Sequence, residues 1–249
     1  MHALLLLSDS ALPLGSFAYS SGLESYLAHN KPLPRSTTVI ASFQRFLELS
    51  IASIASTSIP YLLAAYRDPE SLVTLDNDLD ASTPCVVAQR ASVAQGRALL
   101  GVWERAFRET YKNQPDWAPE SSRRAIDVIG RFSDDLKSSV GGPDDLGPKG
   151  HFAPIWGVVC LAMGVELQQA TYIFMLNHAK AVLSAAVRAS VMGPYQAQSV
   201  LASKTLQDMI TKRIEHEWET DTADAGQLVP ALDLWVGRHE LLYSRIFNS

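Results

Sequence analysis

Apolar residues recur at spacings of three and four along most of the chain, which is the period that lines one face of a helix. The clearest example is the stretch 166–191. Its broad apolar face consists of Tyr172, Met175, Leu176, Ala179, Leu183, Ala186 and Val187. No window shows the sustained alternation of apolar and polar residues that is typical of strands. The pattern therefore predicts an all-α fold, a single-domain helical bundle.

Proline, glycine and clusters of polar residues mark the expected ends of these helices. We expect helices over residues 16–29, 36–67, 84–112, 120–138, 151–163, 166–191, 195–216 and 230–243. Pro60 should kink or divide the second helix. Ser82 or Thr83 should cap the third, with Pro84 at its first position, and residues 68–80 should form a polar link before it.

The links between these helices are short, which favours one domain over residues 1–249. Within it, residues 113–150 combine a charged helix with loops rich in Gly, Pro and Asp. We expect this segment to form an excursion from the core bundle.

The N-terminal stretch Leu4–Leu27 has a different composition, in which a run of four leucines precedes small and turn-forming residues. Ser8, Asp9, Pro13 and Gly15 interrupt it too often for a continuous core helix. We interpret these residues as a break that separates two packed elements. Such a turn offers a surface to a partner protein rather than a site for chemistry on a substrate.

Composition and charge narrow the possible functions. The 249-residue chain is 47% apolar and 19% charged, with a formal net charge of −5. Its Lys and Arg residues are scattered, so neither nucleic acid nor an anionic membrane surface is an expected partner. No run approaches the roughly 20 apolar residues of a membrane span. Cys85 and Cys160 stand alone in apolar surroundings, as buried free thiols of a reducing compartment do, and we expect a cytoplasmic protein.

A search for catalytic and metal-binding motifs gives no site. The stretch Gly142–Lys149 falls short of a P-loop, because Pro148 stands where the lysine is needed. The six histidines include no pair at the spacing of ligands on one helix face, and no serine lies in a nucleophile elbow. We therefore expect no enzyme activity, no cofactor and no metal site. Metal ligands assembled from distant segments or across a dimer would escape this search.

Two features of the sequence are unusual for a simple helical bundle. Arg188 lies in an otherwise small and apolar helix face, close to Gln198 at the start of the next predicted helix. Arg188 could extend to the bundle edge, pair with an internal carboxylate or present a donor fork to a partner. Gln198 could cap exposed carbonyls beside it. The apolar C-terminal residues Ile246 and Phe247 could fold back onto the core or dock on another protein.

Five ordered motifs resemble those of UreF-type urease accessory proteins. They are Ser8–Glu24 (SDSALPLGSFAYSSGLE), Gln89–Arg97 (QRASVAQGR), Gly150–Gly157 (GHFAPIWG), Ala185–Gln198 (AAVRASVMGPYQAQ) and His239–Ser249 (HELLYSRIFNS). Together they cover nearly the whole chain. The segment 113–150 is similar to what eukaryotic, especially fungal, members carry.

The resemblance implies an all-α protein without catalytic activity of its own, a urease chaperone or adaptor that forms a homodimer. It implies assembly with a UreD/UreH-type accessory protein and a UreG-type GTPase to load nickel into apo-urease. The residues expected to bind these partners are Ser8, Asp9, Pro13, Gly15, Glu24, Arg188, Gln198, Arg245, Ile246, Phe247 and Ser249. Two alternatives are a GTPase-activating protein that contributes an arginine, and a direct nickel chaperone that uses histidines.

The resemblance also suggests how these residues divide between partners. The N-terminal motif and the C-terminal tail would dock the UreD-type protein. The Arg188–Gln198 region would face the GTPase or the second copy of a dimer.

Overall fold

The computed structural model describes residues 1–113, 119–138 and 147–248. Its α-helices are α1 (His2–Ser8), α2 (Leu23–His29), α3 (Val39–Arg67), α4 (Leu72–Ser82), α5 (Val86–Val102), α6 (Arg108–Lys112), α7 (Glu120–Ser138), α8 (Phe152–Ala162), α9 (Leu167–Arg188), α10 (Pro194–Leu201), α11 (Lys204–Glu217) and α12 (Pro230–Arg238). Short turns of other helix types are η1 (Ser16–Ala18), η2 (Pro69–Ser71), the π-helical η3 (Trp103–Phe107), η4 (Thr222–Asp224) and η5 (His239–Leu241). The described residues contain no strand, and the predicted all-α, single-domain fold is confirmed.

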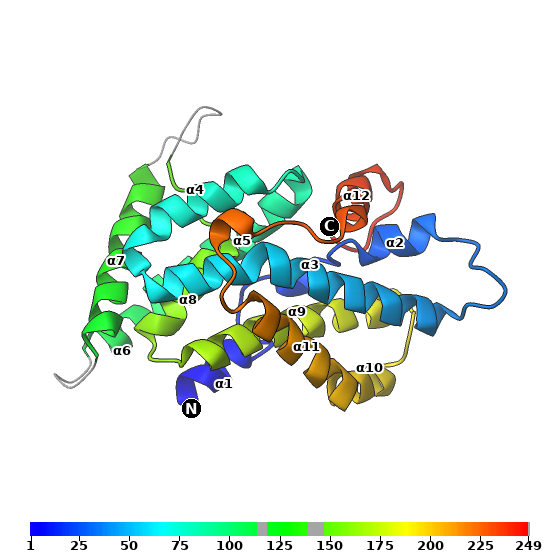
Figure 1. Cartoon of the computed structure of the whole chain (residues 1–249), viewed down its shortest axis with the longest axis horizontal. Coiled ribbons are helices and arrows are strands. Elements are labelled where there is room, and N and C mark those ends of the chain that lie inside the picture. The colour runs from blue at the N-terminus through cyan, green and yellow to red at the C-terminus, as the bar shows by residue number, and fades with distance from the viewer. Residues whose placement is uncertain (114–118, 139–146, 249) are drawn as a thin grey trace.

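Helices α3 and α8 form the centre of the bundle (Figure 1). Every residue of α8 from Ala153 to Ala162 is buried, as expected for a helix that is apolar all round. The two helices cross closely at Gly157, where a Cβ atom would lie 2.4 Å from the backbone oxygen of Leu62. Helices α5 and α7 pack against α8, and α9 and α11 pack against α3.

Helix α3 is 29 residues long and, by length and composition, apolar enough to cross a membrane, although the sequence search did not single it out. However, 72% of its most apolar window is buried inside the structure, as in the core helix of a bundle. Pro60 does not divide α3, contrary to one of the expected outcomes. Pro60 has no N–H to donate to the Ser56 carbonyl. That carbonyl accepts the N–H of Gly226 instead (3.2 Å).

The expected polar link over residues 68–80 is wrong, because most of it is helical in η2 and α4. The leucines that α4 buries on one face are Leu72, Leu75 and Leu79. Ser82 and Thr83, expected to cap the next helix, close α4 instead. Their hydroxyls donate to the carbonyl of Leu79 over 3.2 and 2.7 Å. The aspartates of this stretch led to the prediction of a polar link, although the stretch forms a helix with a narrow apolar face.

The expected helix over 16–29 is divided, because α2 begins only at Leu23. Gly22 lies just before it at a φ of 85°, and a Cβ atom there would lie 3.1 Å from Cγ2 of Val236. A glycine is therefore required both for the left-handed backbone and for the close approach of α12. The break expected after the leucine run is present, because α1 ends at Ser8.

Three other predicted helices are divided in the structure. The stretch 84–112 contains α5, η3 and α6 in succession. The stretch 195–216 forms α10 and α11, because the Ser203 hydroxyl accepts the N–H of Leu206 (3.2 Å) and caps a new helix. The stretch 230–243 ends as α12 and η5, so the C-terminal tail begins at Leu242.

The predicted excursion over residues 113–150 is described only in part. Its helix α7 packs against α8, and the apolar residues Ile129 and Phe132 are buried there. Residues 114–118 and 139–146, which include most of the stretch that falls short of a P-loop, lie outside the described residues.

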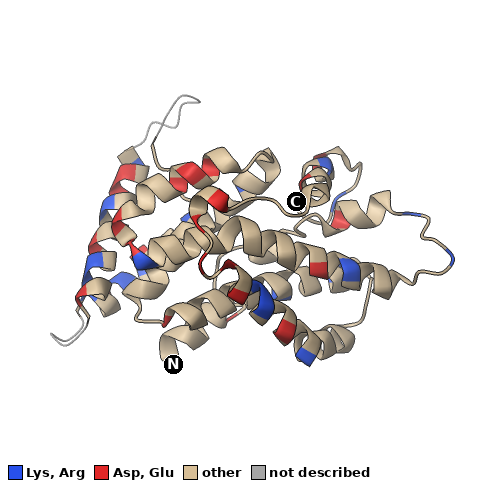
Figure 2. Ribbon diagram, in the orientation of Figure 1, with Lys and Arg blue, Asp and Glu red and all other residues tan. Residues whose placement is uncertain are grey.

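Charged side chains lie mainly on the outer helices, where both signs are interspersed, as α7 and α11 illustrate (Figure 2). Cys85 and Cys160 are free and buried, as expected. Burial raises the pKa of the Cys160 thiol well above its ordinary value, so this cysteine behaves as an apolar core residue.

Candidate functional site

Glu24, in the first turn of α2, connects the N-terminal motif to the C-terminal tail. Its carboxylate accepts hydrogen bonds from His239 Nε2 (2.7 Å) and from the backbone N–H groups of Ile246 (2.8 Å) and Phe247 (3.3 Å). The imidazole of His239 is fully buried, and an ionised carboxylate can only accept, so Nε2 carries the proton in this pair. Three donors far along the chain thus meet one carboxylate.

Arg188, the last residue of α9, closes the same cluster. Its guanidinium donates to the backbone oxygen of Phe17 and lies over the ring of Phe247, with Cζ 4.3 Å from the ring centroid. Partial burial lowers the pKa of Arg188 from its ordinary value, although the residue stays charged. Asn248 donates its N–H to the carbonyl of Ala18 (2.8 Å).

These residues define the Glu24 junction: Phe17, Ala18, Glu24, Arg188, His239 and the tail residues Ile246–Asn248. The tail folds back onto the core, which was one of the two expected outcomes. Phe247 is only 5% exposed, whereas the neighbouring Ile246 is 61% exposed and points away from the core. Of the sites predicted from sequence, the junction unites Glu24, Arg188, Ile246 and Phe247.

The other N-terminal residues predicted to bind partners lie outside the junction. The Ser8 carbonyl, at the end of α1, accepts from Nζ of Lys180 (2.8 Å). Asp9 is exposed, and its carboxylate accepts the N–H of Ala11 (2.9 Å). Pro13 is exposed, and Gly15 takes a left-handed backbone with a φ of 72°.

Of the remaining predicted residues, two are exposed and one is not described. Gln198 is exposed on α10, and its carbonyl accepts the N–H of Ala202 (3.0 Å) within the last turn of that helix. Arg245 is exposed in the tail. Ser249 lies outside the described residues.

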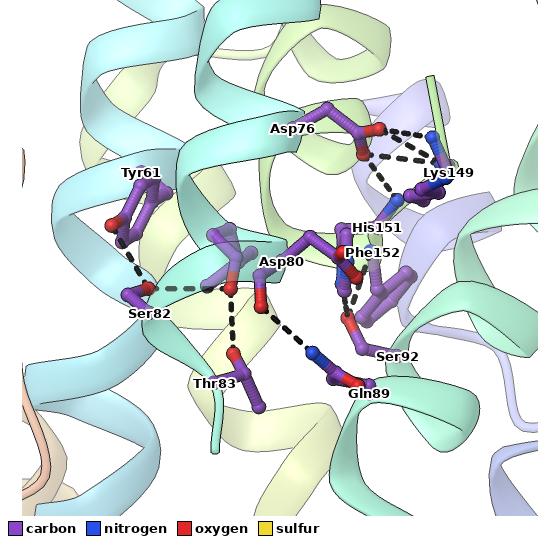
Figure 3. A network of polar contacts seen from close by, with 12 residues as sticks. Tyr61, Asp76, Asp80, Ser82, Thr83, Gln89, Ser92, Lys149, His151 and Phe152 are labelled. Carbon is purple, nitrogen blue, oxygen red and sulfur yellow. Dashed lines mark hydrogen bonds and ion pairs between the residues drawn. The ribbon is translucent and has the colours of Figure 1, made fainter. Parts of the chain in front are cut away.

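A second polar cluster, which the sequence search missed, surrounds Asp76 of α4. The Asp76 carboxylate is fully buried and accepts the N–H groups of Lys149 (2.5 Å), Gly150 (3.0 Å) and His151 (2.5 Å). Figure 3 shows Asp76 pointing at this backbone turn, which leads directly into α8. The signal in the sequence was an aspartate within a helix whose leucines recur every three or four residues.

The buried His151 completes this inner network. Its Nε2 lies 2.9 Å from a carboxylate oxygen of Asp80, and its Nδ1 lies 3.0 Å from the hydroxyl of Ser92 (Figure 3). Gly96 lies beside the turn, where a Cβ atom would be 2.1 Å from the backbone oxygen of Gly150. The Gln89–Arg97 and Gly150–Gly157 motifs therefore contact one another, and their role here is to hold α4, α5 and α8 together.

A cavity of about 340 Å³ lies between the N-terminal segment, α3, α5, α9 and the stretch 225–236. On its wall, Nε2 of His178 lies 2.8 Å from the Ser50 hydroxyl. Burial lowers the pKa of His178 to about 4, so the imidazole is neutral near pH 7. The described residues contain no group of three or more His, Cys, Asp or Glu placed to hold a metal ion.

Comparisons with known proteins agree on one family. The family model named UreF matches residues 38–204. A Schizosaccharomyces pombe protein described as an uncharacterized urease accessory protein UreF-like is 36% identical over 248 residues, covering 100% of this chain and 97% of that protein. Urease accessory protein F of Arabidopsis thaliana is 31% identical over 255 residues, which cover 98% of this chain and 90% of that protein. Urease accessory protein 6 of Cryptococcus neoformans is 26% identical over 316 residues, which cover 100% of this chain and 97% of that protein.

Proposed function

Because the chain belongs to the UreF family of urease accessory proteins, we propose that it is a non-catalytic adaptor in urease maturation. In this proposal it assembles, as a cytoplasmic homodimer, with a UreD/UreH-type accessory protein and a UreG-type GTPase. The assembly helps to load nickel into apo-urease. Nickel is its cargo, and no residue of this chain is assigned as a ligand.

The observation that carries this proposal is the Glu24 junction, which gathers the N-terminal motif, Arg188 and the tail on one surface. Large apolar side chains stand exposed around it: Phe17 (68%), Leu241 (78%), Tyr243 (107%) and Ile246 (61%). Exposed aromatic and aliphatic residues that lie close together are typical of protein interfaces. We assign this surface to the UreD/UreH-type partner.

Capture of that partner tests the assignment. Affinity-tagged chains with Phe17→Ser or Ile246→Ser should retain less than about a tenth of the partner that the wild-type chain retains, because central apolar contacts dominate interface energies. Val73→Ser on α4 is the control, since Val73 is also exposed but belongs to another surface. Undiminished capture by both junction variants would refute the assignment. Substitution is preferable to deletion of the tail, because deletion would also expose the residues of the Glu24 junction that pack around Phe247.

We further assign the Arg188–Gln198 region to the GTPase or to a second copy of the chain. Tyr195 supports this assignment, because it is 91% exposed on α10 beside the exposed Gln198. Light scattering and GTPase capture should each be compared for the wild-type chain and Tyr195→Ser. A variant that keeps both its mass and its GTPase would show that α10 faces neither.

Arg188 is less suited to the alternative role of an arginine finger, since its guanidinium is engaged by Phe17 and Phe247. GTP turnover with and without the chain decides this point. An increase in turnover that Arg188→Ala abolishes would favour the GTPase-activating alternative.

A further inference from the structure

The tail is held in the way that peptide-binding proteins hold a short extended ligand. The consecutive N–H groups of Ile246, Phe247 and Asn248 are each accepted by the N-terminal segment, through Glu24 or the carbonyl of Ala18. Their side chains alternate, with Phe247 buried and its two neighbours exposed. In such complexes main-chain hydrogen bonds anchor the ligand, and a pocket for alternate side chains selects it.

The binding site for this segment, called the seat below, is formed by residues outside the tail. Glu24 and Ala18 supply the acceptors, and Arg188 covers the Phe247 ring. His239 fixes the orientation of the Glu24 carboxylate, because the ring is fully buried and its Nε2 donates to Oε2. Its other nitrogen, Nδ1, is buried and has no hydrogen-bond partner among the described residues, so the bond between Nε2 and Glu24 fixes the ring and the carboxylate relative to one another.

The first residues of the tail do not bury comparable groups. Tyr243, Ser244 and Arg245 are all exposed, with Tyr243 fully so. Ordering an exposed segment costs conformational entropy, which offsets much of what the few contacts of Ile246–Asn248 contribute. Docking of the tail is therefore closely balanced and depends on the acceptors in the seat.

We propose that the Glu24 junction is a peptide-binding site whose ligand is the chain's own tail, and that Glu24 is its positioning residue. The tail docks and detaches without unfolding the bundle. A free peptide with the sequence of residues 243–249 competes for the same seat. This inference concerns the chain alone, so its failure would leave the partner-capture results unaffected.

Hydrogen exchange of the full-length chain is the first test. In the wild-type chain the amides of residues 246–248 should exchange at least tenfold more slowly than those of residues 243–245. Glu24→Gln should remove most of this protection with an unchanged helical CD spectrum. Glu48→Gln is the control, because Glu48 is an exposed glutamate of α3 and should have no effect. An unprotected wild-type tail, or equal protection in Glu24→Gln, would overturn the proposal.

Binding of a labelled peptide is the second test, and it separates a true seat from a merely ordered tail. The full-length Phe247→Ala chain, whose own tail lacks its anchor, should bind a fluorescein-labelled peptide of residues 243–249 saturably. The wild-type chain should bind it at least tenfold more weakly, because its own tail occupies the seat. The double variant Glu24→Gln/Phe247→Ala should also bind at least tenfold more weakly than Phe247→Ala. Equal binding by all three chains, or none by Phe247→Ala, would contradict a peptide-binding site.

Discussion

Two carboxylates, Asp76 and Glu24, accept backbone N–H groups from segments far along the chain, and each cluster includes a fully buried histidine. Their surroundings differ. The Asp76 side chain is fully buried, and the turn that it holds continues into the central helix α8. Glu24 retains 13% exposure, and the segment that it holds follows the exposed residues 243–245. The same hydrogen-bonding chemistry therefore stabilises the fold at one place and positions a movable segment at the other.

Removing the Asp76 carboxylate should have the largest effect. Asp76→Ala removes the acceptor of three backbone N–H groups beside α8, and an unsatisfied buried group costs about 1–3 kcal/mol. We expect a loss of at least about 3 kcal/mol in the free energy of unfolding, measured by urea denaturation. Asp78→Ala, at an exposed position of the same helix, should change it by less than about 0.5 kcal/mol. Similar results for the two variants would mean that the inner network is not a stabilising element.

His178, on the cavity between the two clusters, should give the next largest effect. Its pKa is about 4 in the folded chain and 6.5 ordinarily, so the unfolded state binds more protons between these pH values. Stability should therefore fall as the pH is lowered through this window, by about 2 kcal/mol between pH 7 and pH 5. Urea denaturation of His178→Gln at both pH values should show this part of the dependence removed. If the wild-type chain and the variant respond equally to pH, His178 is not buried in its neutral form.

Truncating Phe247 should reveal the contrast most directly. Phe247→Ala removes a buried ring, yet only the tail should detach, because residues 243–245, which connect it to the bundle, are exposed. We expect a change of less than about 1 kcal/mol in global unfolding, far below the roughly 3–5 kcal/mol typical of a phenylalanine in a packed core. Phe132→Ala, in α7, is the matched core control and should show the larger loss. A comparable loss for Phe247→Ala would place the tail in the cooperative core.

The smallest effect should come from the ion pair that links the two motif-bearing regions. Arg90 of α5 pairs with Glu240 of η5, and both side chains are about half exposed. Exposed pairs contribute at most about 1 kcal/mol and are screened by salt. Arg90→Gln should therefore change the midpoint of thermal unfolding only slightly, and less at high salt. A large effect would indicate that the Glu24 junction and the inner network unfold as one unit.

The sequence was most informative about elements that depend on local periodicity. The core helices α3, α8 and α9 follow from their apolar spacing, and the break before Gly15 follows from turn-forming residues. The prediction failed at α4, where three aspartates outweighed three leucines. It also failed at α2, because the need for glycine at position 22 arises from the approach of Val236, which lies on a distant helix.

The candidate site was predicted only in part. The motifs singled out Glu24, Arg188 and Phe247 individually, because their residue types are unusual for their positions. His239 and Ser92 appeared within motifs but were not assigned to a site, and Asp76 and Asp80 lay in a stretch that was interpreted as a polar link. A polar residue inside a helix gives no indication of its partner when that partner is a backbone group.

By itself, then, the amino-acid sequence determined the helical fold class, the main core helices and the family, because helical periodicity and short motifs are local properties. Only the tertiary structure decided which residues meet. The bond from His151 to Asp76 spans 75 positions, and the bond from Ile246 to Glu24 spans 222. Such pairs form because the packing of the helices brings distant segments together, and no local spacing encodes that packing.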